Sequence, residues 1–210
     1  MIDEIGAAPR GYLAAFARLL EQVEITTDRG ERLDLDDAVD ALVDSILSIK
    51  DSNAKILLIG NGGSAAIVSH TQNDLCKMVG VRAMVFTEGP LLTATANDDG
   101  YHAVFHRPIE LWADAHDLLI AVSSSGESEN VVKAATAARA KGCRLVTMTG
   151  FSPTNRLRQV GDMNVYVPAA TYGYVETAHA LIAHCVTDIA MLRAGAATVR
   201  LDDAVFETPS

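Results

Sequence analysis

Residues 55–64 read KILLIGNGGS, and this stretch decides the fold. The apolar run at residues 56–59 is typical of a short buried strand. A glycine-rich turn follows at residues 60–64 and leads directly into a helical pattern. A buried strand, a tight turn and a helix in this order form the first half of a β-α-β unit, so the sequence indicates a parallel sheet.

Four further apolar runs repeat this alternation of strand and helix. They lie at residues 83–86, 118–122, 144–148 and 164–167. Helices are expected at about residues 64–79, 101–113, 128–141, 154–160 and 173–194. Five strands separated by helices predict an α/β fold with a doubly wound, five-stranded parallel sheet flanked by helices.

Two amphipathic helices are expected before the first strand, at residues 8–24 and 35–50. Their apolar faces could pack against another subunit. We therefore expect residues 1–52 to form a helical extension for oligomer packing. Residues 53–196 would form a single ligand-binding domain, and residues 197–210 a tail.

Composition and charge exclude several classes of protein. The 210-residue chain is 49% hydrophobic, and its formal net charge of -10 opposes broad binding to nucleic acid or anionic lipid. No apolar run approaches the roughly 18 residues of a membrane-spanning helix, and the three cysteines contain no C-x-x-C pair. We therefore expect a cytoplasmic protein without nucleic-acid or membrane partners. Any anionic ligand would be bound locally by backbone amides, hydroxyls and helix N-termini.

The turn at residues 60–64 is the first candidate ligand-binding loop. Its glycines allow a ligand to approach closely, and the N-terminus of the following helix offers unpaired N–H groups to an anion. The turn has neither the lysine of a P-loop nor the G-x-G-x-x-G spacing of a dinucleotide fold, which disfavours a nucleotide. A tight turn without a ligand stays open as the alternative.

Residues 123–130 read SSSGESEN and form the second candidate loop. Hydroxyl groups and free amides gather between a strand and a helix, where a phosphate could be held without a cation. One serine would suffice to cap the helix, whereas this loop has four. Because open parallel sheets bind ligands at the carboxyl ends of their strands, we expect both loops at one site.

Two helices carry titratable residues at spacings that suit acid–base or metal chemistry. His70 and Asp74 lie four residues apart on one face of the helix after the first loop. Glu176 and His184 lie on the last helix, about 80° apart around its axis. If the two helices meet, these four side chains form a nitrogen and oxygen set that suits zinc. Two alternatives stay open: His70 and Asp74 could form an ordinary surface pair, and a histidine on either helix could make a hydrogen bond without taking part in chemistry. His179 is expected to be structural or interfacial.

With these features the sequence resembles the SIS (sugar isomerase) domains. GNGGS and SSSGESEN are similar to the paired loops of that class, whose serine loop binds the sugar phosphate. The two N-terminal helices, the histidine after GNGGS, the Asn97-Asp98 pair and the late histidine helix resemble phosphoheptose isomerases. The resemblance covers about residues 8–195. It implies a cytoplasmic, homotetrameric sugar-phosphate isomerase with an SIS fold, most like the sedoheptulose 7-phosphate isomerases.

The resemblance also implies roles for the candidate residues. Asp74 and His184 would be the base and the acid of proton transfer. Zinc, which some members bind, would be held by His70, Asp74, Glu176 and His184. The phosphorylated sugar would be bound by Asn61, Gly62, Ser64, Asn97, Asp98, Ser123, Ser124, Ser125 and Ser128.

The chain departs from the family pattern in three places. Asp74 stands where a glutamate is expected, Glu176 stands where a glutamine is expected, and the approach to the last helix is about three residues shorter. Aspartate is one methylene shorter, so a proton-transfer distance of about 3 Å requires a closer approach. Glu176 adds a negative charge that favours a bound dication. These changes affect the prediction of the substrate more than the prediction of the reaction class.

Two rival interpretations remain open. A non-enzymatic SIS protein would sense a sugar phosphate or act as an adaptor, as the DnaA initiator-associating proteins do. A sugar-phosphate etherase or an amide-transfer accessory domain would use the same loops with different proton-transfer residues.

Overall fold

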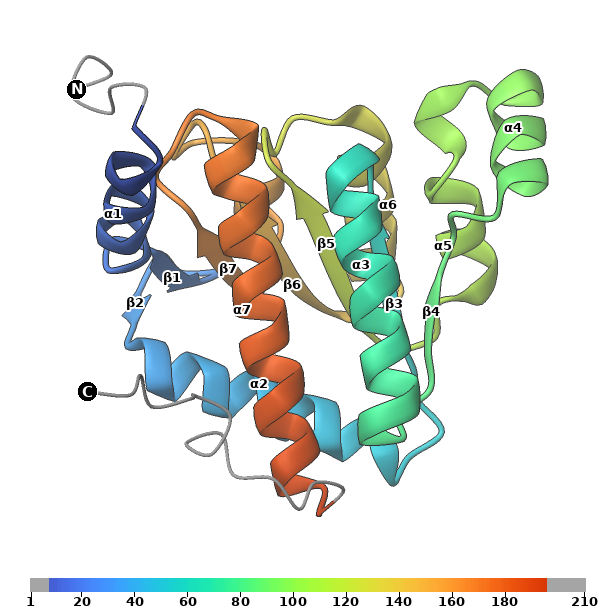
Figure 1. The fold of residues 1–210 in the computed structure, drawn as a ribbon. Coiled ribbons are helices and arrows are strands. Elements are labelled where there is room, and N and C mark those ends of the chain that lie inside the picture. Colours follow the sequence, from blue (N-terminus) through green and yellow to red (C-terminus); the bar gives the residue numbers. More distant parts are fainter. Residues whose placement is uncertain (1–7, 196–210) are drawn as a thin grey trace.

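The computed structural model describes residues 8–195, which form a seven-stranded sheet between two layers of helices (Figure 1). The strand order is β2-β1-β7-β6-β5-β3-β4. The five parallel strands are β3 (Ile56–Gly60), β4 (Ala83–Val85), β5 (Leu118–Ser123), β6 (Arg144–Thr149) and β7 (Met163–Tyr166). They coincide with the five predicted strands, so the α/β fold with a doubly wound parallel sheet is confirmed.

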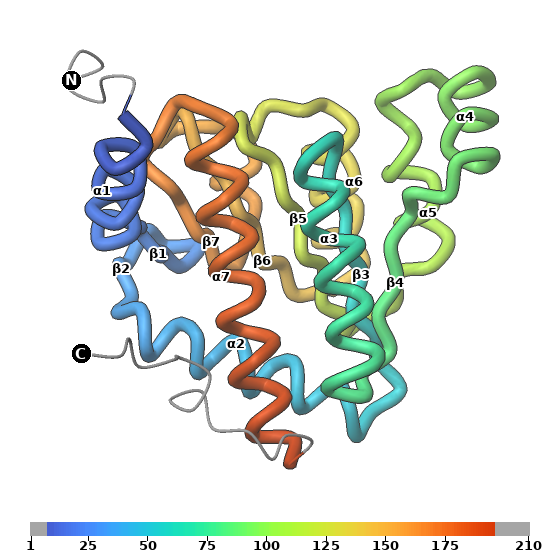
Figure 2. The backbone as a smooth tube through the Cα atoms, viewed as in Figure 1, coloured from blue at the N-terminus to red at the C-terminus, as the bar shows by residue number. Residues whose placement is uncertain are grey.

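Side chains of the central strands alternate between two apolar cores. In β3, Ile56 and Leu58 face one core, while Leu57 and Ile59 face the other. The first core is covered by α2 (Leu35–Lys50), α3 (Gly62–Asp74) and α7 (Tyr172–Arg193), and the second by α5 (His106–Trp112) and α6 (Glu129–Ala140). A strand buried on both faces is apolar throughout, which is why the sequence pattern revealed it. On the first face, α3 and α7 run side by side (Figure 2).

The N-terminal segment adds two antiparallel strands to the sheet. After α1 (Pro9–Leu20), the hairpin of β1 (Glu24–Thr27) and β2 (Arg32–Leu33) pairs through β1 with β7. The sheet therefore has seven strands rather than five, and the expected helix at residues 8–24 ends early. Strands of four and two residues are too short to show an alternating pattern.

The second helix belongs to the core of the sheet. Val43 and Ile46 of α2 are buried against the strands. A role of residues 1–52 in oligomer packing stays a prediction. The tail expected at residues 197–210 lies outside the described residues.

Three other helical segments differ from the sequence prediction. α4 (Gly89–Asp98) was missed because none of its residues is fully buried and only Leu92 and Ala96 pack against the second core, which is too few for a clear apolar period. The expected helix at residues 101–113 is a 3-10 turn (Tyr101–Ala103) followed by α5, and the one at residues 154–160 is a single 3-10 turn (Leu157–Gln159). α3 continues beyond Asp74 as a π-helical turn (Leu75–Val79).

α7 is long and apolar. Its 22 residues include an 18-residue window with a mean hydropathy of 1.2, so by length and composition alone it could cross a membrane. Val175, Ala178 and Ala190 of this helix are fully buried, and the helix packs against α2 and α3. Only 33% of the apolar window lies inside the protein, so burial accounts for part of its apolar composition.

A buried carboxylate joins β3 to β5 at the amino ends of these strands. Asp117, which is 0% exposed, accepts hydrogen bonds from Lys55 N (2.9 Å), Lys55 Nζ (2.7 Å) and Asp114 N (2.8 Å). Three donors satisfy the charge of this buried group, and they fix the start of both strands.

Replacing Asp117 with asparagine should destabilise the fold. The Asp117→Asn amide turns N–H donors toward Lys55 Nζ and Asp114 N, and the half-buried ammonium keeps only its exposed partner Asp114. Donors left unsatisfied in this way cost about 1–3 kcal/mol, measurable as the free energy of unfolding in urea. Asp114→Asn is the control, because that carboxylate also pairs with Lys55 but its side chain is 79% exposed. Equal stability of Asp117→Asn and the wild type would contradict this role.

Candidate active site

The first loop connects β3 to α3. Asn61 occupies the N-cap position of α3, and Gly62 has a φ of 53°, in the left-handed region that favours glycine. Asparagine usually caps a helix with its own side chain. Within residues 8–195, however, the Asn61 side chain makes no capping hydrogen bond and pairs with Asn130 instead. The first turn of α3 therefore has N–H groups available for an anion.

The second loop connects β5 to α6. Ser123 Oγ accepts a hydrogen bond from Gly126 N (3.2 Å) and donates one to Ser128 Oγ (3.5 Å). Gly126 has a φ of 66°, and a Cβ at this position would overlap the buried side chain of Asn155. Ser124 is buried, and its hydroxyl has no partner among the described residues. The loop is thus held tightly while it presents several hydroxyl groups.

The two loops enclose a hollow of about 290 Å³ at the carboxyl edge of the sheet. They meet because β3 and β5 are adjacent parallel strands, with Gly60 beside Val122. The hollow is lined by every loop residue that was predicted to bind substrate: Asn61, Gly62, Ser64, Ser123, Ser124, Ser125 and Ser128. Tyr172 and Glu176 of α7 also line it.

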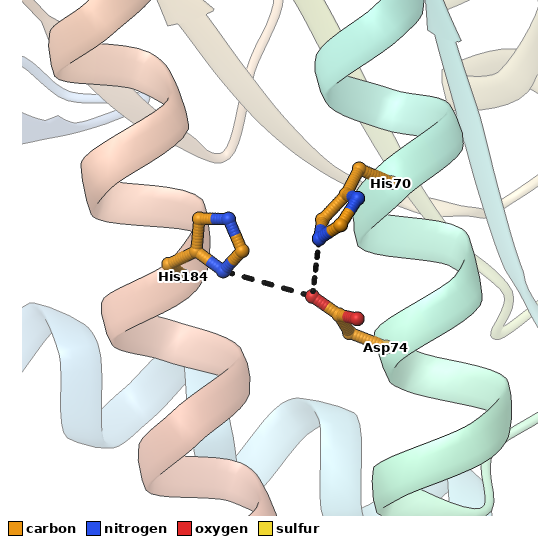
Figure 3. A group of neighbouring side chains, drawn as sticks. All are labelled: His70, Asp74 and His184. Atoms are coloured by element: carbon orange, nitrogen blue, oxygen red, sulfur yellow. Dashed lines mark ion pairs between the residues drawn. The ribbon is translucent and has the colours of Figure 1, made fainter. Parts of the chain in front are cut away.

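A second hollow, of about 240 Å³, lies further along α3 and α7 and contains three titratable residues (Figure 3). His70 Nε2 lies 3.5 Å and His184 Nδ1 lies 3.7 Å from Asp74 Oδ2. The two imidazole rings are 5.0 Å apart between centroids. Asp74 is only 7% exposed. The two helices therefore meet within one chain and place one carboxylate between two imidazoles.

Comparisons with known proteins identify the family. The model of the SIS domain matches residues 11–150. The phosphoheptose isomerase of Coxiella burnetii (strain Dugway 5J108-111) is 34% identical over 167 residues, which cover 72% of this chain and 84% of that protein. This chain belongs to the phosphoheptose isomerase family. A second member, from Geobacter sp. (strain M21), is 31% identical over 198 residues, covering 90% of this chain and 95% of its own.

Solved structures agree with this assignment. Phosphoheptose isomerase GmhA from Neisseria gonorrhoeae superposes with a TM-score of 0.72 at 26% identity, over 86% of this chain and 95% of that one. A phosphoheptose isomerase from Francisella tularensis, with a TM-score of 0.74 and 23% identity over the same shares, has the same fold. The SIS fold and the resemblance to phosphoheptose isomerases are confirmed.

Glu176 lies apart from the His70, Asp74 and His184 cluster in this member of the family. A Cβ at Gly63 would overlap the Glu176 carboxylate, so the glycine makes room for it at the N-terminus of α3. Eight residues of α-helix separate Glu176 from His184, about 12 Å along the axis. The structure thus brings three of the four predicted zinc ligands together and places the fourth between the two loops.

The Asn97-Asp98 pair lies at the end of α4. Both residues are exposed, and Asn97 Nδ2 donates a hydrogen bond to Asp98 Oδ1 (2.8 Å). Neither lines the hollow between the loops. Their contact with substrate stays a prediction.

Two carboxylates of the serine loop are neutralised by neighbouring cations. Arg156 Nε donates to Glu127 Oε2 (2.8 Å), and Glu129 pairs with Lys133 (3.3 Å) and Arg156 (3.5 Å). The hydrogen bond from Arg156 is the main reason why the pKa of Glu127 lies below its ordinary value. The loop therefore carries little net negative charge beside the proposed phosphate site.

Three polar residues near the loops were missed by sequence reasoning. Tyr172 lines the hollow, and Asn130 and Tyr101 hydrogen-bond to Asn61. Asn130 lies within the quoted serine loop, so a search for amides beside the hydroxyls could have found it. Tyr101 follows α4, and nothing in the sequence pattern connects it with residues 60–64.

His179 is a buried neutral histidine of α7 at the end of β6. It is 0% exposed, and its Nε2 lies 3.1 Å from the carbonyl oxygen of Thr149, the last residue of β6. A carbonyl only accepts, so Nε2 carries the proton. Burial lowers the pKa of His179 to about 4. The residue ties α7 to the sheet, as a structural histidine would.

This lowered pKa predicts an acid-dependent loss of stability. Between pH 6.5 and about 4, the unfolded chain binds a proton at His179 that the folded chain does not. The free energy of unfolding should therefore fall, as pH falls through this window, by about 1.4 kcal/mol per pH unit more in the wild type than in His179→Gln. Denaturant unfolding at several pH values measures this difference.

His116→Asn provides the control for this experiment, because His116 is exposed and asparagine tolerates its φ of 75°. Its pH dependence should match that of the wild type. The same slope in the wild type and in His179→Gln would show that His179 does not titrate in this way.

Proposed function

We propose that this chain is an aldose–ketose isomerase that converts sedoheptulose 7-phosphate into a heptose 7-phosphate through an enediolate. The supporting observation is the alignment of two hollows along α3 and α7. One is lined by hydroxyl and backbone N–H groups that suit a phosphate, and the other contains a carboxylate between two histidines. The relatives named phosphoheptose isomerases support the seven-carbon substrate.

The loops would bind the phosphate and orient the sugar. Ser123, Ser125 and Ser128 offer hydroxyls to the phosphate, and the first turns of α3 and α6 offer N–H groups. Asn61 and Ser64 would contact the sugar chain. Asp98 would contact the sugar only if the end of α4 moves toward the hollow.

Asp74 and His184 would transfer the protons. In a ketose, removal of a C1 proton and protonation of the C2 carbonyl oxygen give the enediol. Return of a proton to C2, with loss of the proton on O1, completes the aldose. Asp74 is the base for the carbon-bound proton, and His184 protonates the oxygen or shuttles the second proton. His70, on the other side of the carboxylate, helps to orient it.

The same three residues would hold a divalent metal, with zinc as the proposed ion. Their donor atoms lie within 4.8 Å of one another, and the two distances to Asp74 Oδ2 are 3.5 and 3.7 Å. Ligands around a tetrahedral zinc lie roughly 3.4 Å apart, given bonds of about 2.0–2.2 Å, so the donor set fits. When bound, the ion would supply Lewis-acid polarisation of the substrate carbonyl.

The proposal includes a cytoplasmic homotetramer. Leu13 of α1 and Leu35 at the start of α2 are 65% and 52% exposed, and apolar side chains of this size would gain from burial against another subunit.

Purified protein incubated with sedoheptulose 7-phosphate in D2O should form an aldose that carries solvent deuterium at C2. Asp74→Asn removes the base, so its kcat should fall by at least about 10²-fold. Isothermal titration should show that binding of the sugar phosphate is largely kept, because the serine loop is unchanged.

Two results would contradict the proposal. If no sugar phosphate is turned over, the enzyme assignment fails, and a protein recovered by pull-down would then favour the adaptor. If Asp74→Asn turns over at the wild-type rate, the carboxylate is not the base.

Metal binding gives an independent test of the cluster. The wild type should bind one zinc per chain, and His70→Ala should weaken this binding roughly a hundredfold or more through loss of a direct ligand. His102→Ala is the matched control, because that histidine is exposed and lies outside the cluster. Equal zinc affinity in all three proteins would place the ion elsewhere.

A further inference from the structure

A hydrogen-bonded group of three side chains connects the two loops. Asn61 and Asn130 form a reciprocal amide pair, with 2.9 Å from Asn61 Nδ2 to Asn130 Oδ1 and 2.9 Å from Asn130 Nδ2 to Asn61 Oδ1. Tyr101 OH lies 3.0 Å from Asn61 Oδ1. We call these residues the amide clamp. Asn130 is only 2% exposed, whereas Tyr101 is 55% exposed.

A backbone N–H fixes the direction of every hydrogen bond in the amide clamp. Val131 N lies 3.0 Å from Asn130 Oδ1, and a backbone N–H can only donate. The Asn130 atom that faces it is therefore the oxygen, so Asn61 presents its nitrogen to that oxygen. The other atom of the Asn61 amide is then an oxygen, and Tyr101 must donate to it.

This polarity determines what Asn61 offers to a ligand. Its oxygen accepts from both Asn130 and Tyr101 and has both lone pairs engaged. Its nitrogen uses one hydrogen on Asn130 and keeps the other. Asn61 lines the hollow between the loops, so it faces that hollow as a hydrogen-bond donor only.

The amide clamp also keeps the α3 N-terminus open. Asn61 stands at the N-cap position, where an asparagine side chain normally accepts from the helix's own N–H groups. Its oxygen is engaged elsewhere, so those N–H groups are not consumed by a cap. Without Asn130, the freed oxygen would turn back to α3 and compete with a ligand for them.

We propose that Asn130 and Tyr101 are positioning residues that hold Asn61 as a donor to an oxygen of the phosphorylated sugar and keep the first turn of α3 uncapped. This inference rests on the proposed function for the identity of the ligand. Neither residue needs to touch the substrate. Both act through Asn61, and this dependence distinguishes them from residues that only support the fold.

The test is a set of double-mutant cycles read out by binding. The Kd for sedoheptulose 7-phosphate is measured by isothermal titration in an Asp74→Asn background, in which turnover is expected to be slow. Tyr101→Phe and Asn130→Ala should each weaken binding by roughly three- to tenfold, the range expected for loss of one hydrogen bond. In an Asn61→Ala background, the same two substitutions should have no further effect, because the side chain on which they act is absent.

Two measurements keep the test clear of folding effects. Asn130 is buried, so Asn130→Ala could unfold the chain; Tyr101→Phe removes only an oxygen from a largely exposed side chain and should leave the thermal midpoint unchanged. Tyr174→Phe is the matched control, because it removes a tyrosine hydroxyl bonded to Tyr12 O (3.3 Å) outside the hollow and should leave Kd unchanged.

The outcomes separate this inference from the proposed function. An unchanged Kd in Tyr101→Phe, or the same loss with and without the Asn61 side chain, overturns the amide clamp even if the wild type is an active isomerase. Absence of turnover in the wild type, with the expected pattern of Kd values in the cycles, defeats the isomerase proposal and leaves the amide clamp standing.

Discussion

The parallel pairing of β3 with β5 is the constraint on which the rest of the site depends. The register places Gly60 beside Val122, so the chain leaves both strands at the same level of the sheet. The two loops then start one strand spacing apart, about 4.8 Å, and the N-termini of α3 and α6 must converge. Asp117 fixes the same two strands at their opposite ends. A slip of one residue would exchange the faces of every β5 side chain and separate the loops from their partners.

The proposed site would bind an anion in a chain that is itself strongly negative. The net charge is -10, and within residues 8–195 no lysine or arginine lines the hollow between the loops, so attraction would have to come from N–H groups and hydroxyls. Ion pairs with Arg156 and Lys133 neutralise the acidic residues of the serine loop. The Glu176 carboxylate lies against Gly63 at the N-terminus of α3. Its charge therefore opposes a nearby phosphate and favours a ligand that presents hydroxyl donors at that point.

Features set by local pattern could be read from the sequence, and features set by distant contacts could not. The buried strands, both loops and the His70 and Asp74 pair follow from runs of apolar residues and helical spacing. The separation of Glu176 from His184 is set by the rise along the helix, which the angle around its axis does not reveal. Asn61 hydrogen-bonds to Asn130, which is 69 residues away in the sequence, so this pair forms only after the sheet has formed. α4 was not predicted because only Leu92 and Ala96 of this helix pack against the core, which is too few for a detectable apolar period.

The arrangement of the two hollows itself favours a long substrate. Six residues of α3 separate Ser64, beside the serine loop, from His70 in the cluster, which corresponds to about 9 Å along the helix. A short sugar phosphate held by the loops would leave its carbonyl near Glu176, away from the proton-transfer residues. In the proposed function, a seven-carbon chain would place its carbonyl several bonds further from the phosphate, toward Asp74. Glu176 would then face the carbons between these ends, where a carboxylate accepts hydrogen bonds and a glutamine would also donate them. The exchange of glutamine for glutamate would therefore act on the recognition of the hydroxyl groups, whereas the proposed proton transfer would depend on Asp74 and His184.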